Sequence, residues 1–206
     1  IDDVQNSLAA GEAMIATYVS NDQSYIWAIP KSGKVQFTSA PLGKEKIIDI
    51  VGELREALDP QATTLGKIPT FNVALSHQLY QSLLAPVRDG WKNAKNLLVV
   101  GHRGLAQLPF SVLVTKPHAL AKEKEGDALF SNYKDVPWLV RTHTVTVLPS
   151  ASALASFRAV PTSKNRRRAF IGFGDPYFSA KQAANAAATK PVQVASAPGD
   201  FNARSR

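Results

Sequence analysis

The sequence has 206 residues, of which 45% are hydrophobic, and it contains no cysteine. This length allows one or two domains with a buried core, and the absence of thiols excludes disulfides, thiolate metal sites and a cysteine nucleophile within these residues. The formal net charge of +8 is uneven, because residues 1–100 hold 9 Lys/Arg and 10 Asp/Glu whereas residues 101–206 hold 15 and 6.

The first 69 residues predict a small β-meander followed by a helix. Residues 14–19, 25–29 and 34–38 are rich in β-branched and aromatic side chains, and turn-forming residues separate them. This pattern is typical of a three-stranded meander or of two linked hairpins. The next segment, 44–58, has apolar residues three and four positions apart, which predicts an amphipathic helix packed on the meander. These apolar residues are Ile47, Ile50, Val51, Leu54 and Leu58.

A second helix is predicted over residues 70–85, after a polar link at 60–69. Its apolar stripe consists of Phe71, Leu75, Leu79 and Leu83, and Thr70 stands where a capping residue is expected.

Three short apolar runs then predict parallel strands, at residues 96–101, 144–149 and 169–174. Such runs are typical of strands that helices cover on both faces. Ser150 is expected to cap a helix over 151–157, between the second strand and the third. Alternation of strands and helices predicts an α/β fold with a mostly parallel sheet and right-handed crossovers.

The last segment, residues 179–206, differs in composition. It is rich in alanine and small polar residues and has no large apolar face, so we expect a linker or a disordered tail. Three parallel strands without a final helix form an unfinished sheet, and the first residue is not Met. We therefore expect the sequence to be part of a longer gene product.

Four segments, taken in order, resemble the CHAT domain family. They are Leu79–Pro86, Leu97–Leu113 with its Leu-Pro-Phe, Trp138–Ala151, and Phe170–Pro176. The resemblance covers roughly residues 70–178. One turn departs from the family: Gly101-His102-Arg103-Gly104 stands where the family usually has Pro-Asp-Gly. Because glycine is still present, we expect the backbone of this turn to be preserved.

The resemblance implies a caspase-like α/β/α sandwich, here represented by its first half, often linked to tetratricopeptide repeats in bacteria. Active members are cysteine peptidases with a His–Cys dyad in Thr-His-Gly and Ser-Ala-Cys segments, neither of which occurs here. No residue is therefore assigned a catalytic role, and no cofactor or metal is implied. Two functions stay open: part of a cysteine endopeptidase whose dyad lies outside these residues, or an inactive scaffold in signalling or defence.

The expected partners follow from these alternatives. They are the missing C-terminal part of the same domain, repeat domains or a regulatory protein, and a peptide substrate in the complete protein only. No apolar run approaches the roughly 20 residues that span a bilayer, and the first residues do not form a signal peptide, so no membrane contact is predicted. Localisation is not determined by the sequence.

Two residues are candidates for the rim of a cleft, His102 and Asp175. Each follows a predicted strand at its carboxyl end, where sites in open α/β sheets gather. A solvated turn is the alternative for His102, and a turn-stabilising role before proline is the alternative for Asp175. The other histidines are His77, expected to be exposed on its helix, His118 and His143; no pair has the spacing of metal ligands.

The densest basic run consists of Lys164, Arg166, Arg167 and Arg168. Two interpretations of this run are open. It is a solvated loop, or it docks on an acidic region of the same protein or of a partner. Nucleic-acid binding is a remote alternative, because aromatic residues are not interleaved with these charges. The glycines before Asp175 lack the third glycine of a nucleotide loop, and no serine has the G-x-S-x-G context of a hydrolase.

Overall fold

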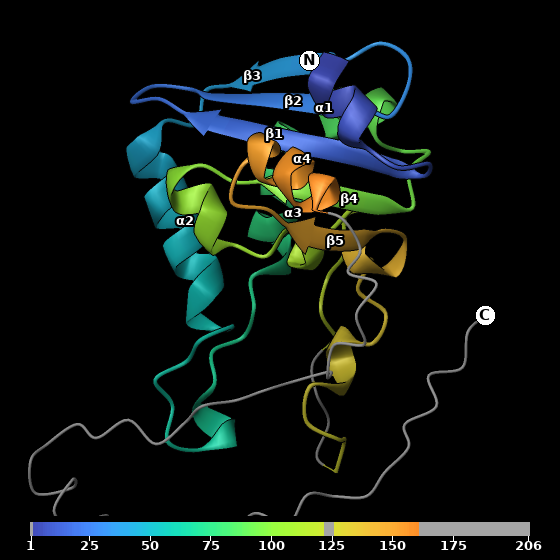
Figure 1. Cartoon of the computed structure of the whole chain (residues 1–206). Coiled ribbons are helices and arrows are strands. Elements are labelled where there is room, and N and C mark those ends of the chain that lie inside the picture. The colour runs from blue at the N-terminus through green and yellow to red at the C-terminus, as the bar shows by residue number, and fades with distance from the viewer. Residues whose placement is uncertain (1, 122–125, 161–206) are drawn as a thin grey trace, which may run out of the picture. The chain divides into compact units, whose positions relative to one another are not determined.

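The computed structural model describes residues 2–121 and 126–160, which belong to one compact unit. A five-stranded sheet runs through this unit in the order β3-β2-β1-β4-β5 (Figure 1). Its strands are β1 (Glu12–Val19), β2 (Ser24–Pro30), β3 (Gln36–Ala40), β4 (Asn96–Val100) and β5 (Thr144–Val147). The predicted α/β fold is confirmed.

Strand β1 joins two kinds of pairing in one sheet. It pairs with β2 antiparallel, and β2 pairs with β3 antiparallel, so the predicted meander is confirmed. On its other side β1 pairs with β4 in parallel, from Glu12 opposite Asn96 to Ala16 opposite Val100. Strand β5 is parallel to β4. The meander and the first parallel strands therefore share one hydrogen-bonded sheet.

Helices cover both faces of this sheet. They are α1 (Asp2–Ser7), α2 (Lys44–Glu56), α3 (Val73–Leu83) and α4 (Ala151–Ala159). Helices α1 and α4 lie together on one face, in front of the sheet in Figure 1, and α2 and α3 pack on the other. Short 3₁₀ helices complete the connections: Leu65–Lys67, Ala85–Gly90, Arg103–Gln107, Phe110–Val112, Ser131–Tyr133 and Leu139–Arg141.

The two faces of the sheet bury cores of different size. The larger core joins Ile15 and Leu97 of the strands to Ile47 and Leu54 of α2 and to Leu83 of α3. The i, i+3, i+4 spacing of α2 explains this contact, because it gathers the apolar side chains on one stripe. The smaller core joins Met14, Ile29 and Leu98 to Leu8 and to Leu154 of α4. Leu108 and Phe110 of the Leu-Pro-Phe segment are buried.

Helix α3 begins later than predicted. Its N-cap is Asn72, whose side-chain oxygen accepts a hydrogen bond from the Leu75 N–H at 2.9 Å. Thr70 therefore does not cap the helix. The Phe71 N–H donates instead to the hydroxyl of Tyr133, a residue far away in the sequence, at 2.8 Å. This tertiary contact holds Phe71 outside the helix.

The second predicted parallel strand is present but is not covered on both faces. Strand β5 is mostly exposed, and Val147 retains 58% of its accessible surface. Among the described strands β5 is the last of the sheet, so a second strand does not shield its outer side. Ser150 caps α4 as predicted, accepting from the Ala153 N–H at 3.1 Å. The third predicted strand, at 169–174, and the predicted tail, at 179–206, lie outside the described residues.

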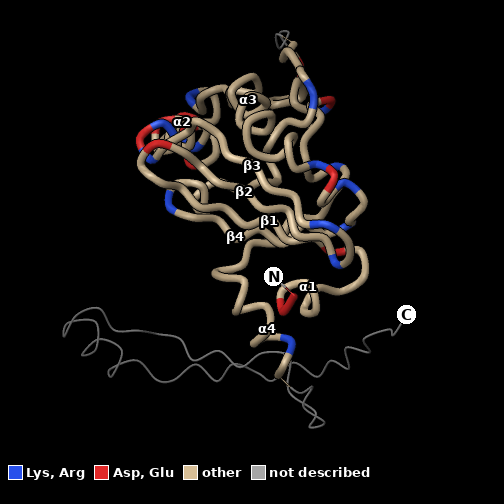
Figure 2. Tube along the Cα trace, turned by 90° about the horizontal axis from the view of Figure 1, so that it is seen from above, with Lys and Arg blue, Asp and Glu red and all other residues tan. Residues whose placement is uncertain are grey.

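Charge is placed at the turns and helices of the described part. Strands β2, β3, β4 and β5 carry no charged residue, and Figure 2 shows the first three of them in tan, without blue or red. Residues 1–160 hold 16 Lys/Arg and 14 Asp/Glu, a net charge of +2, so most of the basic excess belongs to residues 161–206. A helix of the length and apolarity that a bilayer requires is not found among the described residues.

Candidate functional site

The carboxyl ends of β1 and β4 meet at His102. This residue follows β4 and is joined to β1 by two hydrogen bonds, one at its ring and one at its backbone N–H. The Val19 N–H donates to its Nδ1 at 3.0 Å. Its own backbone N–H donates to Thr17 Oγ1 at 3.0 Å, and that hydroxyl donates to the Val100 carbonyl at 3.3 Å. Because Nδ1 accepts, the neutral ring carries its proton on Nε2. His102 therefore offers one oriented donor at the carboxyl end of two parallel strands.

An aromatic strip continues from His102 across the sheet. The imidazole stacks on the ring of Tyr18, with centroids 4.7 Å apart and planes 12° apart. Tyr18 approaches Tyr25 at 6.3 Å, Tyr25 stacks on Phe37 at 6.3 Å, and Phe37 approaches Trp27 at 5.2 Å. The register pairs Tyr18 with Tyr25 and Trp27 with Phe37, so these side chains share one face.

The aromatic strip was not predicted from the sequence, although a signal was present. Aromatic residues at alternating positions of neighbouring predicted strands could have been aligned on one face. What the sequence could not supply was the register that brings them opposite each other, nor the placement of His102 beside Tyr18. Tyr18 and Phe37 are exposed, so the strip is a surface and not part of the core.

The turn after β4 uses its glycines for close packing. A Cβ on Gly101 would lie 2.6 Å from the Ala106 Cα, and one on Gly104 would lie 3.0 Å from Ile47 Cγ2. The positive φ of this turn falls on Arg103, at 52°, a region that residues with a Cβ rarely adopt. Arg103 is exposed next to His102.

The remaining histidines are His77, His118 and His143, and all three are half-buried. His77 is half-buried, not exposed as predicted, because its Nδ1 lies 2.8 Å from the Val114 carbonyl. The rings of His143 and Trp91 are roughly perpendicular, with centroids 5.0 Å apart. Burial lowers the pKa of His143, and a hydrogen bond with the Lys92 backbone opposes that shift only in part. His118 is half-buried in a loop. Within the part of the chain that the structure describes, acidic, histidine and cysteine residues form no cluster able to hold a metal ion.

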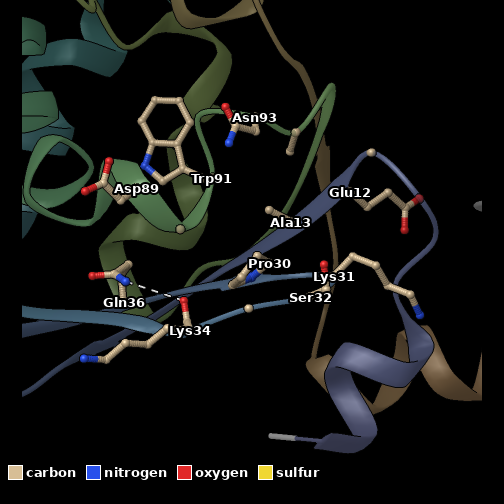
Figure 3. A pocket seen from close by; sticks show the side chains of 14 residues that line it. Glu12, Ala13, Pro30, Lys31, Ser32, Lys34, Gln36, Asp89, Trp91 and Asn93 are labelled. Carbon is tan, nitrogen blue, oxygen red and sulfur yellow. Dashed lines mark hydrogen bonds between the residues drawn. The ribbon is translucent and has the colours of Figure 1, made fainter.

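A hollow near the amino ends of β1 and β4 lies at the opposite edge of the sheet from His102. It has a volume of about 410 Å³ and is lined by residues of the β2–β3 turn, the start of β1 and the segment before β4, including Glu12, Lys31, Trp91 and Asn93 (Figure 3). Glu12 is directed to an ion pair with Arg158 of α4, at 2.7 Å. These residues include no nucleophile paired with a base, so the hollow offers no catalytic arrangement.

The pKa of Glu12 records this ion pair. Burial alone would raise the pKa of the carboxyl group, but hydrogen bonds from Arg158 and from the Ala9 N–H, together with the charges of Arg158 and Lys31, outweigh it and leave the pKa lowered. The guanidinium also donates to the Ser7 carbonyl. The contact therefore joins α4 to β1 and to the end of α1.

Two predicted sites cannot be placed. Asp175 and the basic residues Lys164, Arg166, Arg167 and Arg168 lie outside the described residues. His102 is thus the sequence-predicted site residue whose surroundings the structure gives.

The CHAT domain family model matches residues 73–201. The chain belongs to the CHAT domain family. Neither a curated protein nor a solved structure matches the chain. The match begins at the first residue of α3 and takes in β4, β5 and α4 of the CHAT domain. The three meander strands and α2 precede the match, yet β1 supplies the strand on which β4 is paired.

Proposed function

We propose that this chain supplies the front part of a CHAT domain that acts, in the complete gene product, as a cysteine endopeptidase. The observation that carries the proposal is the family match over a parallel pair, β4 and β5, in an α/β sheet. Ligands of such sheets bind beyond the carboxyl ends of the strands, where His102 lies.

The chemistry requires residues that this chain does not contain. An imidazole assists formation of a thiolate, which attacks the peptide carbonyl and gives an acyl-enzyme. Because the chain has no cysteine and no Thr-His-Gly segment, the nucleophile and its histidine would come from outside these residues. The role proposed for this chain is to build the sheet and one wall of the cleft.

His102 is the residue proposed to contact the substrate from this wall. Because the Nδ1 of His102 accepts a hydrogen bond from the Val19 N–H, its Nε2–H can donate one to a peptide carbonyl. Asp175 is proposed as a second residue at the rim of the cleft, because it follows a predicted strand at its carboxyl end. The basic residues Lys164, Arg166, Arg167 and Arg168 are proposed to dock on an acidic region of the same protein or of a partner.

The test uses the complete gene product that contains this chain. A peptidyl acyloxymethyl ketone, which alkylates an activated thiolate, is expected to label one cysteine there and to leave the 206-residue chain unlabelled. Replacing that cysteine by alanine should abolish both labelling and peptide cleavage. A gene product without a labelled cysteine would overturn the peptidase proposal.

A second measurement separates the role of His102 from the peptidase activity. His102→Gln in the active gene product is expected to raise KM while labelling at saturating probe is retained. An unchanged KM would overturn the rim role of His102 and leave the peptidase proposal intact.

The alternative function is an inactive CHAT scaffold in signalling or defence. It is favoured by the same absence of cysteine from the chain. The gene on both sides of these residues distinguishes the two, since a scaffold would lack the histidine and cysteine segments. The complete gene sequence would also test two further proposals, a bacterial origin and a linkage to tetratricopeptide repeats.

A further inference from the structure

Two long connections of the chain enclose an apolar pocket away from His102. One connection leads from α2 to α3, and the other leads from the 3₁₀ helix at Phe110–Val112 towards β5. An isolated bridge between Val114 and Trp138 closes the second connection on itself. We call the cavity between them the aromatic pocket. It has a volume of about 190 Å³ and is lined by Ala57, Leu58, Ile68, Pro69, Phe71, Val112, Phe130, Tyr133 and Trp138.

The walls of the aromatic pocket are ordered by ring contacts and by one hydrogen bond. Phe71 meets Trp138 edge to face at 5.4 Å, and Tyr133 stacks on Trp138 at 6.3 Å. The Tyr133 hydroxyl accepts from the Phe71 N–H at 2.8 Å. The polar tip of Tyr133 is thus directed to the backbone, and its ring faces the pocket. A pocket formed in advance of binding costs little to order when a ligand enters.

A second hollow adjoins the aromatic pocket and shares Ile68, Pro69, Phe130 and Tyr133 with it. Large apolar side chains lie around the openings of both. Four of the eleven exposed large hydrophobic residues in the described part lie there: Leu58, Leu65, Leu129 and Phe130. Leu65 is 61% exposed and Leu129 is 53% exposed. Phe130 has a φ of 63°, a left-handed conformation that is unfavourable for a bulky residue. An exposed apolar patch of this kind marks an interaction surface.

Carboxylates border this patch on the side of α2. The charged residues that line the aromatic pocket and the hollows adjoining it are Glu53, Glu56, Asp59 and Lys67, three acidic and one basic. Asp59 pairs with Arg55 at 3.4 Å. Among the described residues, Glu53 and Glu56 form no ion pair, Glu53 Oε1 accepts a hydrogen bond from the Asn72 side-chain amide at 2.7 Å, and both carboxylates are exposed. A basic group of a ligand bound in the pocket would therefore meet unneutralised carboxylates.

We propose that the aromatic pocket docks a protein segment in which one large apolar side chain is flanked by lysine or arginine. The apolar side chain fills the pocket, where burial of its surface contributes most of the affinity. The flanking cations lie over Glu53 and Glu56, which favours basic segments over acidic ones and makes association salt-dependent. The site is separate from the proposed peptidase cleft and does not depend on it.

The test measures binding of short fluorescein-labelled peptides to the full chain by fluorescence anisotropy. The probe has a single central Phe flanked on both sides by Lys. Two matched peptides have the Phe replaced by Ala, or every Lys replaced by Glu. The Lys–Phe peptide is expected to bind at least about tenfold more tightly than either control.

Variants of exposed leucines in the adjoining hollow, which shares Ile68, Pro69, Phe130 and Tyr133 with the aromatic pocket, assign the site. Leu65→Ser and Leu129→Ser change exposed side chains and are expected to weaken the Lys–Phe peptide about tenfold. Glu53→Gln with Glu56→Gln should weaken it about threefold and reduce its salt dependence. Ile48→Ser changes an apolar residue of α2 that is 49% exposed; it is the matched control and should leave binding unchanged. Urea unfolding midpoints check that each variant is folded.

Three results would overturn the proposal. The first is equal binding of the Lys–Phe peptide and either control peptide. The second is binding that the Leu65 and Leu129 variants leave unchanged in folded protein. The third is concentration-dependent self-association in sedimentation that Leu129→Ser abolishes, which would assign the patch to a second copy of the chain.

Discussion

Strands β4 and β5 are similar in sequence but occupy opposite situations in the sheet. Both are short, uncharged and rich in aliphatic or β-branched residues. Strand β4 lies between β1 and β5, and Leu97 within it has no exposed surface. Strand β5 is the last described strand, and three of its four residues are exposed.

The segments that follow these strands are attached to the sheet by different contacts. After β4 the chain enters a glycine-dependent turn in which His102 bonds the ends of two strands. After β5 it enters α4, which is joined to β1 through the ion pair of Arg158 with Glu12. The comparison shows that an apolar run predicts a strand, whereas burial depends on the neighbours that the strand acquires. Substitutions in and after the two strands therefore test how far stability is concentrated around β4.

The largest effect is expected within the strands themselves. Leu97→Ala should lower the free energy of unfolding by about 2–5 kcal/mol, because it leaves a cavity in the larger core. Val147→Ala in β5 should cost less than about 1 kcal/mol, because its side chain is mostly exposed. Urea unfolding of the full chain measures both. Equal losses would show that β5 is as deeply buried as β4.

The turn after β4 should give the next largest effect. His102→Ala removes the acceptor of the Val19 N–H and the ring stacked on Tyr18, and should cost about 1–3 kcal/mol. Arg103→Ala is the matched control, because the side chain is exposed and alanine keeps the same backbone restriction. A loss for His102→Ala no greater than for this control would mean that the junction does not hold β1 to β4.

The tether of α4 should contribute less, and its contribution should depend on pH. Arg158→Met is expected to cost about 1 kcal/mol or less at neutral pH, since Arg158 is partly exposed. The pKa of Glu12 is lowered in the folded chain from its ordinary value of 4.5, so the stabilisation is present above that value. It is lost as the pH falls through the folded pKa, where the carboxylate is protonated.

Unfolding of wild type and Arg158→Met at neutral and acidic pH measures this change. Arg141→Met is the control, because Arg141 donates to the backbone carbonyls of Val136 and Lys134 and not to a carboxylate. Its cost should not disappear with Glu12 protonation. A cost of Arg158→Met that persists fully in acid would assign the contact to packing of the arginine stem.

The smallest effect should be a gain in stability. Arg103→Gly removes the Cβ from a residue with φ of 52°, and this relief is offset in part by the greater freedom of glycine in the unfolded chain. A net increase of about 0.5 kcal/mol is expected, again measured by urea unfolding. A decrease would indicate that the arginine side chain makes a stabilising contact.

Much of the fold could be predicted because its local signals are strong. The meander, α2, β4 and the Ser150 cap of α4 each follow from a period or a capping residue within a few positions. The start of α3 could not be predicted, because Phe71 is held out of the helix by Tyr133, more than sixty residues away. The pairing of β1 with β4 crosses a longer gap in the sequence and has no local signature.

The candidate site was predicted only as a position along the chain. The end of an apolar strand identified His102, but its hydrogen bonds to Val19 and Thr17 depend on the parallel pairing of β1 with β4. The aromatic pocket has no counterpart in the sequence patterns, because its walls come from two connections without regular periodicity.

By itself the sequence determined the meander, α2, β4 and the cap of α4, the α/β class and the resemblance to the CHAT domain family, because short-range spacing and capping encode them. The absence of cysteine likewise determined that a thiol nucleophile is not among these residues. The tertiary structure alone decided that β4 is central and β5 is exposed, that His102 joins two strands, and that four aromatic rings enclose a pocket. These features are contacts between distant segments, and their energies depend on burial that only the assembled sheet and helices create.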